Sequence, residues 1–284
     1  MNKYILVTES GSDLPQKYLD KYKIKIVQMH VTMGDETYDD KDVQVEKIFD
    51  YYDKEKSLAT TSGATPGDFE KVFKQINEEN KDAKIIYIAY SSVTTVSFNS
   101  ARLAAENFDN VYLIDSKNVS VGLGSLVIET AKFIEKNKDA SPEDIIAFVE
   151  DVRERLRFIF LPQTLLFLRA GGRVSNAAYL GAILLRIFPT INIENGYLVA
   201  GKKYRGSFKI AYRKLINEFF RENDFEEGSI RLVKVPDLNE GHIKNIESLL
   251  SFHKIEDYDW FDTGSVIACH GGPGAMGISG ILKK

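Results

Sequence analysis

The chain has 284 residues, of which 44% are hydrophobic and 27% charged, so it can bury a large core and lacks the composition of a disordered segment. Its net charge of −4 gives no support for the clustered basic surface of a nucleic-acid-binding protein. The single cysteine excludes an intramolecular disulfide, and no stretch approaches the roughly 18 apolar residues of a membrane span. We therefore expect a soluble cytoplasmic protein.

The first half alternates short apolar segments, rich in Ile, Val and Tyr, with helical patterns. The predicted strands span residues 4–8, 24–31, 84–90 and 111–115, and the predicted helices span 42–55, 66–80, 96–107 and 122–137. Such alternation predicts a mostly parallel sheet between two helical layers, that is, a three-layer α/β/α domain over residues 1–155. A further helix, capped by Ser141 and running to about Arg157, leads into a second domain.

The second half, residues 156–284, has a different pattern. Its predicted strands span 157–161, 189–193, 197–204, 230–235 and 266–270, and its predicted helices span 176–187, 207–223 and 240–252. The Asn195-Gly196 pair is typical of a tight turn, so we expect a hairpin and an α/β domain with a mixed sheet. The segment 177–188 is apolar almost all round, which fits either a buried core helix or the wall of an apolar ligand cavity.

A glycine-rich string, Gly272 to Gly277, fits the dinucleotide pattern G-x-G-x-x-G. Only seven residues follow it, so there is no room for the βαβ unit that this pattern opens, and no P-loop lysine follows a glycine. We instead expect a strand over 265–269 that delivers His270 to its carboxyl end, where His270 either binds an anion or is structural. Cys269 is on the opposite face of such a strand, which argues against a Cys-His pair.

The four histidines show no metal-ligand spacing, so we expect neither a metal nor a cofactor. Small hydroxyl residues gather at two predicted strand-to-helix junctions, 59–69 and 90–101. They fit ordinary helix caps, and they equally fit an anion site built from hydroxyls and helix N-termini.

Six segments together resemble the DegV family, which includes the fatty-acid-binding subunits of bacterial fatty acid kinase. They occur in the family's order and span the chain: "VTESGSDLP" (7–15), "TSGATPGDF" (61–69), "YSSVTTVSFNSA" (90–101), "IDSKNVSVGLG" (114–124), "LLFLRAGGRVS" (165–175) and "HGGPGAMG" (270–277). The resemblance implies two α/β domains and one long-chain fatty acid, its tail in an apolar pocket of the C-terminal domain and its carboxylate at the domain junction.

The resemblance also implies roles for individual residues. Thr61, Ser92 and His270 match the positions that bind the carboxylate. Ser62, Arg173 and Arg205 match positions that contact the head group or a partner protein. The resemblance implies a lipid-binding protein that is not itself an enzyme. It would present the fatty acid either to a separate ATP-dependent kinase subunit, for acyl-phosphate formation, or to lipid metabolism. Neither nucleic acid nor more than transient membrane contact is expected.

The sequence departs from the family pattern in its hydroxyl loops. Gly63 and Ala64 replace glutamine and proline, Val93 and Val96 replace glycines, and Glu9 replaces an aspartate. Two other classes of function stay open at this point. One is a stand-alone hydrolase or small-molecule kinase that uses Ser92 and His270, and the other is an interaction protein whose C-terminal half is a filled core.

Overall fold

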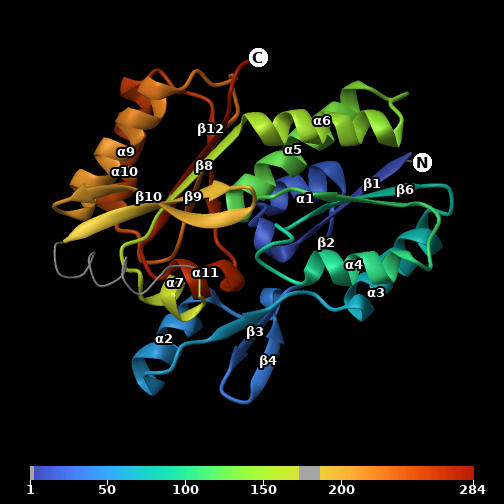
Figure 1. The fold of residues 1–284 in the computed structure, drawn as a ribbon, viewed down its shortest axis with the longest axis horizontal. Coiled ribbons are helices and arrows are strands. Elements are labelled where there is room, and N and C mark those ends of the chain that lie inside the picture. The colour runs from blue at the N-terminus through green and yellow to red at the C-terminus, as the bar shows by residue number, and fades with distance from the viewer. Residues whose placement is uncertain (1–2, 173–185) are drawn as a thin grey trace.

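The computed structural model describes residues 3–172 and 186–284, which form two large sheets and one small sheet (Figure 1). The first large sheet, sheet A, has the strand order β2-β1-β6-β7, and every neighbouring pair is parallel. Its strands are β1 (Tyr4–Glu9), β2 (Lys25–Val27), β6 (Lys84–Ala89) and β7 (Val111–Asp115). The prediction of a mostly parallel sheet in the first half is confirmed.

Helices cover both faces of sheet A, because apolar side chains alternate between the faces along each strand. Ile5 and Val7 of β1 pack into the core beneath α3 and α4, whereas Tyr4 and Leu6 pack into the core beneath α5 and α6. Figure 1 shows these two helix pairs on opposite sides of the strands. Their bounds are α3 (Pro66–Glu79), α4 (Ser97–Ala105), α5 (Ser120–Lys136) and α6 (Pro142–Arg155).

The second large sheet, sheet C, is mixed, as predicted. Only β11 and β12 pair in parallel, and the other neighbours are antiparallel. In spatial order its strands are β10 (Tyr197–Arg205), β9 (Ile187–Glu194), β8 (Leu156–Leu161), β13 (Met276–Ile281), β11 (Ile230–Lys234) and β12 (Tyr258–Asp262). One face packs against α9 (Phe208–Glu222) and α10 (Glu240–Phe252).

The other face of sheet C packs against α5, which therefore touches both large sheets. Arg231 of β11 is 1% exposed, and its Nη2 lies 2.6 Å from Glu129 Oε1 on α5. Ser125 and Ser279 hydroxyls meet across the same contact at 2.9 Å. This shared layer joins the two halves of the chain, and the division at residues 155 and 156 stays a prediction.

A small antiparallel sheet, sheet B, was not predicted. It consists of β4 (Glu36–Asp39), β3 (His30–Met33) and β5 (Thr60–Ser62). The prediction of one strand over 24–31 is wrong, since the chain leaves sheet A after Val27 and enters sheet B at His30. The remaining elements are α1 (Gln16–Tyr22), α2 (Val45–Glu55), α7 (Leu166–Ala170), α11 (Ser265–Gly271) and the 3₁₀ turns η1 (Ser10–Ser12) and η2 (Asp40–Asp42).

The predicted strand over 266–270 is also wrong, because these residues form helix α11. All of α11 except His270 is buried, so its sequence shows no polar face, and a short apolar segment of this kind does not distinguish a buried helix from a strand. The strand at this end of the chain is β13, after the glycines. The helix predicted over 176–187 lies outside the described residues except at its end, where Ile187 begins β9.

Candidate functional site

His270 lies in the last turn of α11, and its Nε2 is 2.7 Å from the Oγ1 atom of Thr61 in β5. Both side chains are partly buried. Either partner can donate this hydrogen bond, depending on which ring nitrogen carries the proton. The structure thus brings together two of the residues singled out in the sequence, from opposite ends of the chain.

The register of sheet B decides which hydroxyls of β5 face inward. Thr61 pairs with the fully buried Val31 of β3, whereas its neighbours Thr60 and Ser62 are exposed. Side chains alternate along a strand, so Thr61 points toward α11 and Ser62 points away from it. Ser62 therefore belongs to the outer surface beside the Thr61–His270 contact.

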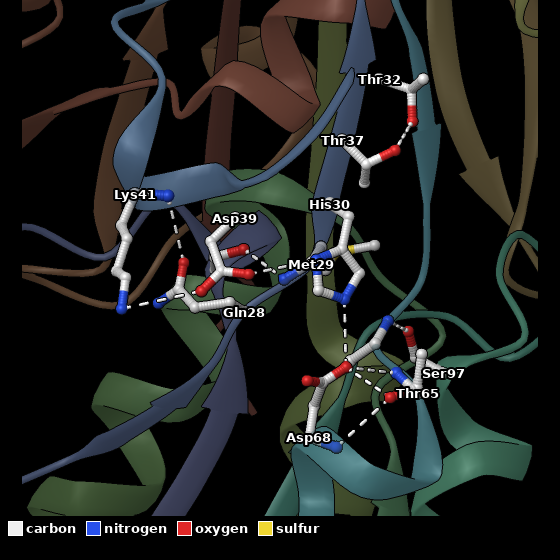
Figure 2. Close-up of polar contacts among 12 residues, drawn as sticks. Gln28, Met29, His30, Thr32, Thr37, Asp39, Lys41, Thr65, Asp68 and Ser97 are labelled. Atoms are coloured by element: carbon white, nitrogen blue, oxygen red, sulfur yellow. Dashed lines mark hydrogen bonds and ion pairs between the residues drawn. The ribbon is translucent and has the colours of Figure 1, made fainter. Parts of the chain in front are cut away.

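A second histidine holds the turn between β5 and α3 (Figure 2). His30 Nε2 lies 3.0 Å from Asp68 Oδ2, and His30 Nδ1 lies 3.3 Å from Asp39 Oδ1. Asp68 also forms a capping box with Thr65 at the start of α3. Burial alone would raise the pKa of Asp68, but hydrogen bonds from Thr65 and His30 outweigh burial and leave that pKa below its ordinary value.

Ser92 is bonded to a carboxylate that the sequence reasoning missed. Its Oγ donates to Asp115 Oδ2 at 2.5 Å, and its backbone N–H points at Asp115 Oδ1 at 3.3 Å. A serine hydroxyl has one proton, so in this arrangement Ser92 offers only lone pairs to any other group. A hydrolase would need that proton to go to His270, and here it goes to Asp115. Asp115 ends β7, so its place at the carboxyl end of a predicted strand could have pointed to it.

The two hydroxyl-rich loops touch each other directly. Ala64 N donates to Ser97 Oγ at 3.0 Å. A Cβ atom on Gly63 would lie 2.4 Å from Thr95 Oγ1 and 2.5 Å from Ser97 Oγ, closer than real contacts allow. The departure at Gly63 therefore has a physical reason, because the Thr95 and Ser97 side chains occupy the space that a Cβ atom at position 63 would need.

Glu9 supports the second loop from beneath. It is fully buried at the end of β1 and accepts hydrogen bonds from Tyr87 Oη at 2.7 Å and from Tyr90 N at 2.6 Å. Burial is the main cause that raises its pKa above the ordinary value. Val93 and Val96, the other departures in this loop, are 42% and 68% exposed.

The glycines after His270 serve close packing. A Cβ atom on Gly272 would lie 2.7 Å from Phe167 Cδ2, and one on Gly274 would lie 2.4 Å from Gln163 Nε2. Both glycines have positive φ, +73° and +69°, which L-residues with a side chain rarely adopt. The string thus returns the chain from α11 to β13 against the segment that follows β8, which explains it without a nucleotide.

Cys269 precedes His270 but is only 3% exposed. Burial, followed by the nearby charge of Asp40, raises the pKa of its thiol to about 12. Successive helical residues lie about 100° apart around the axis, so Cys269 and His270 still diverge although the segment is not a strand. In residues 3–172 and 186–284 no three His, Cys, Asp or Glu side chains gather as metal ligands.

Of the two arginines predicted at the head group or a partner surface, the structure describes Arg205, for which no contact with Thr61 or His270 is found. Arg205 is exposed and ends β10 opposite Ile187, at the far end of the strand from the Gly196 turn. That turn is the part of the hairpin that reaches the first half, where Ser91 Oγ donates to Gly196 O at 2.9 Å. Arg173 lies outside the described residues.

A cavity of about 370 Å³ opens in the C-terminal half beside α7. Such a volume is within the range of small-molecule sites, roughly 300–1,000 Å³. Its wall begins in the same segment that touches the glycine string, because Gln163 Nε2 donates to Gly274 O at 2.8 Å. The lining residues are Pro162, Gln163, Thr164, Leu165, Arg186, Ile187, Phe188, Pro189, Gly206 and Ser207.

Comparison with known proteins identifies the family. The family model described as "Uncharacterised protein, DegV family" matches residues 3–283. The chain belongs to the DegV family. A DegV domain-containing protein of Clostridium perfringens is 30% identical over 276 residues, which cover 96% of each chain.

Solved DegV structures share this fold over the whole chain. One from Thermus thermophilus, described by its fatty acid binding, has a TM-score of 0.86 at 28% identity and covers 99% of this chain and 100% of its own. DegV of Bacillus subtilis, described as a fatty acid binding protein, has a TM-score of 0.80 at 27% identity and covers 100% of both chains. In the described part of this DegV protein no helix has the length and apolar character needed to cross a membrane.

Proposed function

We propose that this DegV protein binds one long-chain fatty acid in the cytoplasm, with the carboxylate at the Thr61–His270 contact and the tail in the C-terminal half. The observation that carries the proposal is the 2.7 Å contact between Thr61 and His270, at a junction of sheet B with α11. Two solved relatives that share the fold over their full length are described as fatty-acid-binding proteins, which supports this ligand class.

The contact has the chemistry that a carboxylate needs. When Nε2 carries a proton, His270 donates to Thr61 Oγ1, and the Thr61 proton stays available for the ligand. A hydrogen bond to a charged group is worth roughly 1.5–3 kcal/mol, and a carboxylate buried without such partners is strongly disfavoured. The two residues therefore act as a relay, in which the hydrogen bond from the ring polarises the Thr61 hydroxyl that faces the ligand.

Ser92 has a smaller part in this proposal. To donate to a fatty acid it must give up Asp115, so it exchanges one carboxylate acceptor for another. The net gain from that exchange is small, whereas Thr61 loses no acceptor. We therefore expect head-group recognition to depend more on Thr61 and His270 than on Ser92.

The tail supplies most of the affinity. Each buried methylene contributes about 0.8 kcal/mol before the costs of binding, so a long chain outweighs the head-group bonds. The cavity beside α7 supports the placement of the tail, because its wall touches the loop that follows His270. Residues 156–284 then enclose the tail, and the contact with residues 1–155 orients the head.

A separate ATP-dependent kinase subunit is the proposed partner for acyl-phosphate formation. The glycine string packs closely against Phe167 and Gln163, which argues against its use as a phosphate-binding loop. Ser62 and the exposed Val93 and Val96 lie around the two hydroxyl loops, where a partner would approach the head group. The exposed Arg205 stays a candidate head-group or partner contact.

The experiment is a titration of delipidated protein with hexadecanoic acid, followed by native mass spectrometry. We expect a single bound fatty acid per chain, and no uptake would overturn the proposal. Turnover of acyl esters or of ATP by the isolated chain, with loss of that turnover in Ser92→Ala, would establish the alternative of a stand-alone enzyme.

A further inference from the structure

The N-terminus of α11 is held by two carboxylates that are distant in sequence. Asp13, which follows η1, accepts a hydrogen bond from Gly264 N through Oδ1 at 2.8 Å. Asp40, the first residue of η2, accepts one from Val266 N through Oδ1 at 3.0 Å. Both acceptors come from the first 40 residues, whereas the helix lies near the end of the chain.

Both carboxylates are buried, whereas aspartate side chains are usually exposed on the protein surface. Asp13 is 6% exposed and Asp40 is 4% exposed, and burial raises the pKa of each above its ordinary value. Burial of a carboxylate is costly unless hydrogen bonds and positive potential offset it. The N-terminus of α11 provides the hydrogen bonds and the positive potential, because its first N–H groups have no acceptor within the helix and carry partial positive charge.

The local sequence cannot supply this cap. Gly264 occupies the N-cap position and has no side chain, so the first N–H groups of α11 need acceptors from elsewhere. A Cβ atom on Gly264 would lie 3.1 Å from Asp40 Oδ2, so the glycine also makes room for the carboxylate. Ser120 donates to Asp13 Oδ2 at 2.5 Å, which fixes that carboxylate on α5.

A third bond fixes the same end of the helix. Ser265 Oγ donates to Val43 O at 2.8 Å. The helix is seven residues long, at about 1.5 Å per residue and about 3.6 residues per turn, so fewer than two turns separate its N-terminus from His270 and we expect a shift at the N-terminus to reach the last turn. His270 is on that last turn, so the place of its ring relative to Thr61 follows from the place of Gly264 and Val266.

We propose that Asp13 and Asp40 are positioning residues: through α11 they hold the His270 imidazole toward Thr61, and they thereby set recognition of the acid head group without touching it. The inference rests on the proposed function, since it assigns these carboxylates to the same head-group contact.

The experiment compares two ligands with the same tail, hexadecanoic acid and hexadecan-1-ol, in direct binding titrations. Asp40→Ala removes the acceptor of Val266 N, and Asp40→Asn keeps an acceptor but removes the charge. We expect Asp40→Ala to weaken acid binding by about tenfold or more, the loss of one charge-assisted hydrogen bond, and to leave alcohol binding within about twofold. Asp40→Asn should have an intermediate effect.

Asp42→Asn is the matched control, because Asp42 is exposed on the same 3₁₀ turn. It should leave both affinities unchanged. If Asp40→Ala does not fold, Gly264→Ala provides the second measurement, since its Cβ would press on the Asp40 carboxylate at 3.1 Å and shift it slightly, while the backbone of an L-residue is accommodated there. The acid-to-alcohol ratio should fall in that variant as well.

Two results would overturn the inference. One is an unchanged acid-to-alcohol ratio in folded Asp40→Ala and Gly264→Ala. The other is an equal loss of both ligands, which indicates a structural role only. A double mutant gives the last check: in a His270→Ala background, Asp40→Ala should have no further effect on the ratio. If the wild-type protein binds neither ligand, the proposed function is wrong. That result differs from the two above, in which the wild-type protein binds the acid and only the inference about Asp13 and Asp40 fails.

Discussion

Thr61 Oγ1 and His270 Nε2 are 2.7 Å apart although 209 residues separate them in the chain. The hydrogen bond joins β5 of the small sheet to the last turn of α11. A typical hydrogen bond contributes only about 1 kcal/mol net, so this partly exposed contact adds little to stability, and its proposed role is to bind the head group.

Thr61→Val tests the relay directly. The substitution keeps the shape of the side chain and removes the hydroxyl that would face the carboxylate. We expect affinity for hexadecanoic acid to fall about 10- to 100-fold, the equivalent of one hydrogen bond to a charged group. The free energy of unfolding should change by roughly 1 kcal/mol at most. Fluorescence or calorimetric titration measures the first quantity, and denaturant unfolding the second.

Thr60→Val is the control for this prediction, because Thr60 is on the same strand with its side chain exposed. It should leave fatty acid affinity unchanged. Equal affinities of wild type and Thr61→Val would show that Thr61 does not contact the head group.

Gly63→Ala tests the close approach of the two hydroxyl loops. The new Cβ would meet Thr95 Oγ1 and Ser97 Oγ at 2.4 and 2.5 Å, so the two hydroxyls must rotate and give up their present hydrogen bonds, or a loop must move. Overpacking of this kind destabilises a protein by about 1–3 kcal/mol. Thermal or denaturant unfolding should show the loss of stability.

Gly67→Ala is the matched control, four residues along the same segment. Its Cβ would be 3.7 Å from the nearest atom, Thr65 Oγ1, and it lies in the first turn of α3. Stability should be unchanged or raised by roughly 0.5–1 kcal/mol, because alanine favours helix. A Gly63→Ala variant as stable as Gly67→Ala would contradict the predicted clash.

The sequence predicted the parallel sheet and most helices of the first half because their patterns are periodic. Thr65-Pro66 and Ser141-Pro142 both begin helices with a capping box, as their residue types indicate. Thr61 and His270 were singled out by resemblance to a family, and the structure shows that they touch. Local pattern could not show that contact, since nothing near Thr61 in sequence indicates a partner 209 residues away.

The failures have a common physical cause. Residues 265–271 are buried nearly all round, so their apolar composition contains no period that distinguishes helix from strand. His30 and Thr61 join a sheet of short strands, three or four residues long, which is too short for alternation to be recognised. Asp13, Asp40 and Asp115 act through contacts with distant elements, so their types alone did not reveal them.

Asp68→Ala tests the network around His30 through its pH dependence. The pKa of Asp68 lies below its ordinary value, so the native state favours the charged carboxylate. A lowered pKa stabilises the fold above the unfolded value of 3.8, and that stability is lost as pH falls through the folded value. The variant should be less stable than wild type by about 1–2 kcal/mol at pH 7, and the difference should shrink below about pH 4.

Urea unfolding at several pH values between 3 and 7 measures this difference. Glu78→Ala, an exposed position on the same helix, should change stability little and without a trend in pH. A stability difference for Asp68→Ala that stays constant across the range would show that the charge of Asp68 contributes nothing to the capping box or to His30.

Cys269 should be inert in the native protein. Its thiol is 3% exposed, and burial together with the charge of Asp40 raises its pKa to about 12. Only the thiolate reacts with alkylating reagents, so at pH 8 the native thiol should react with iodoacetamide at least about 100-fold more slowly than the same thiol in the unfolded chain. Mass spectrometry of timed samples, with and without guanidinium chloride, measures both rates. Rapid labelling of the folded protein would mean that α11 opens to solvent, and it would contradict the fixed position of His270 on which the proposed head-group recognition depends.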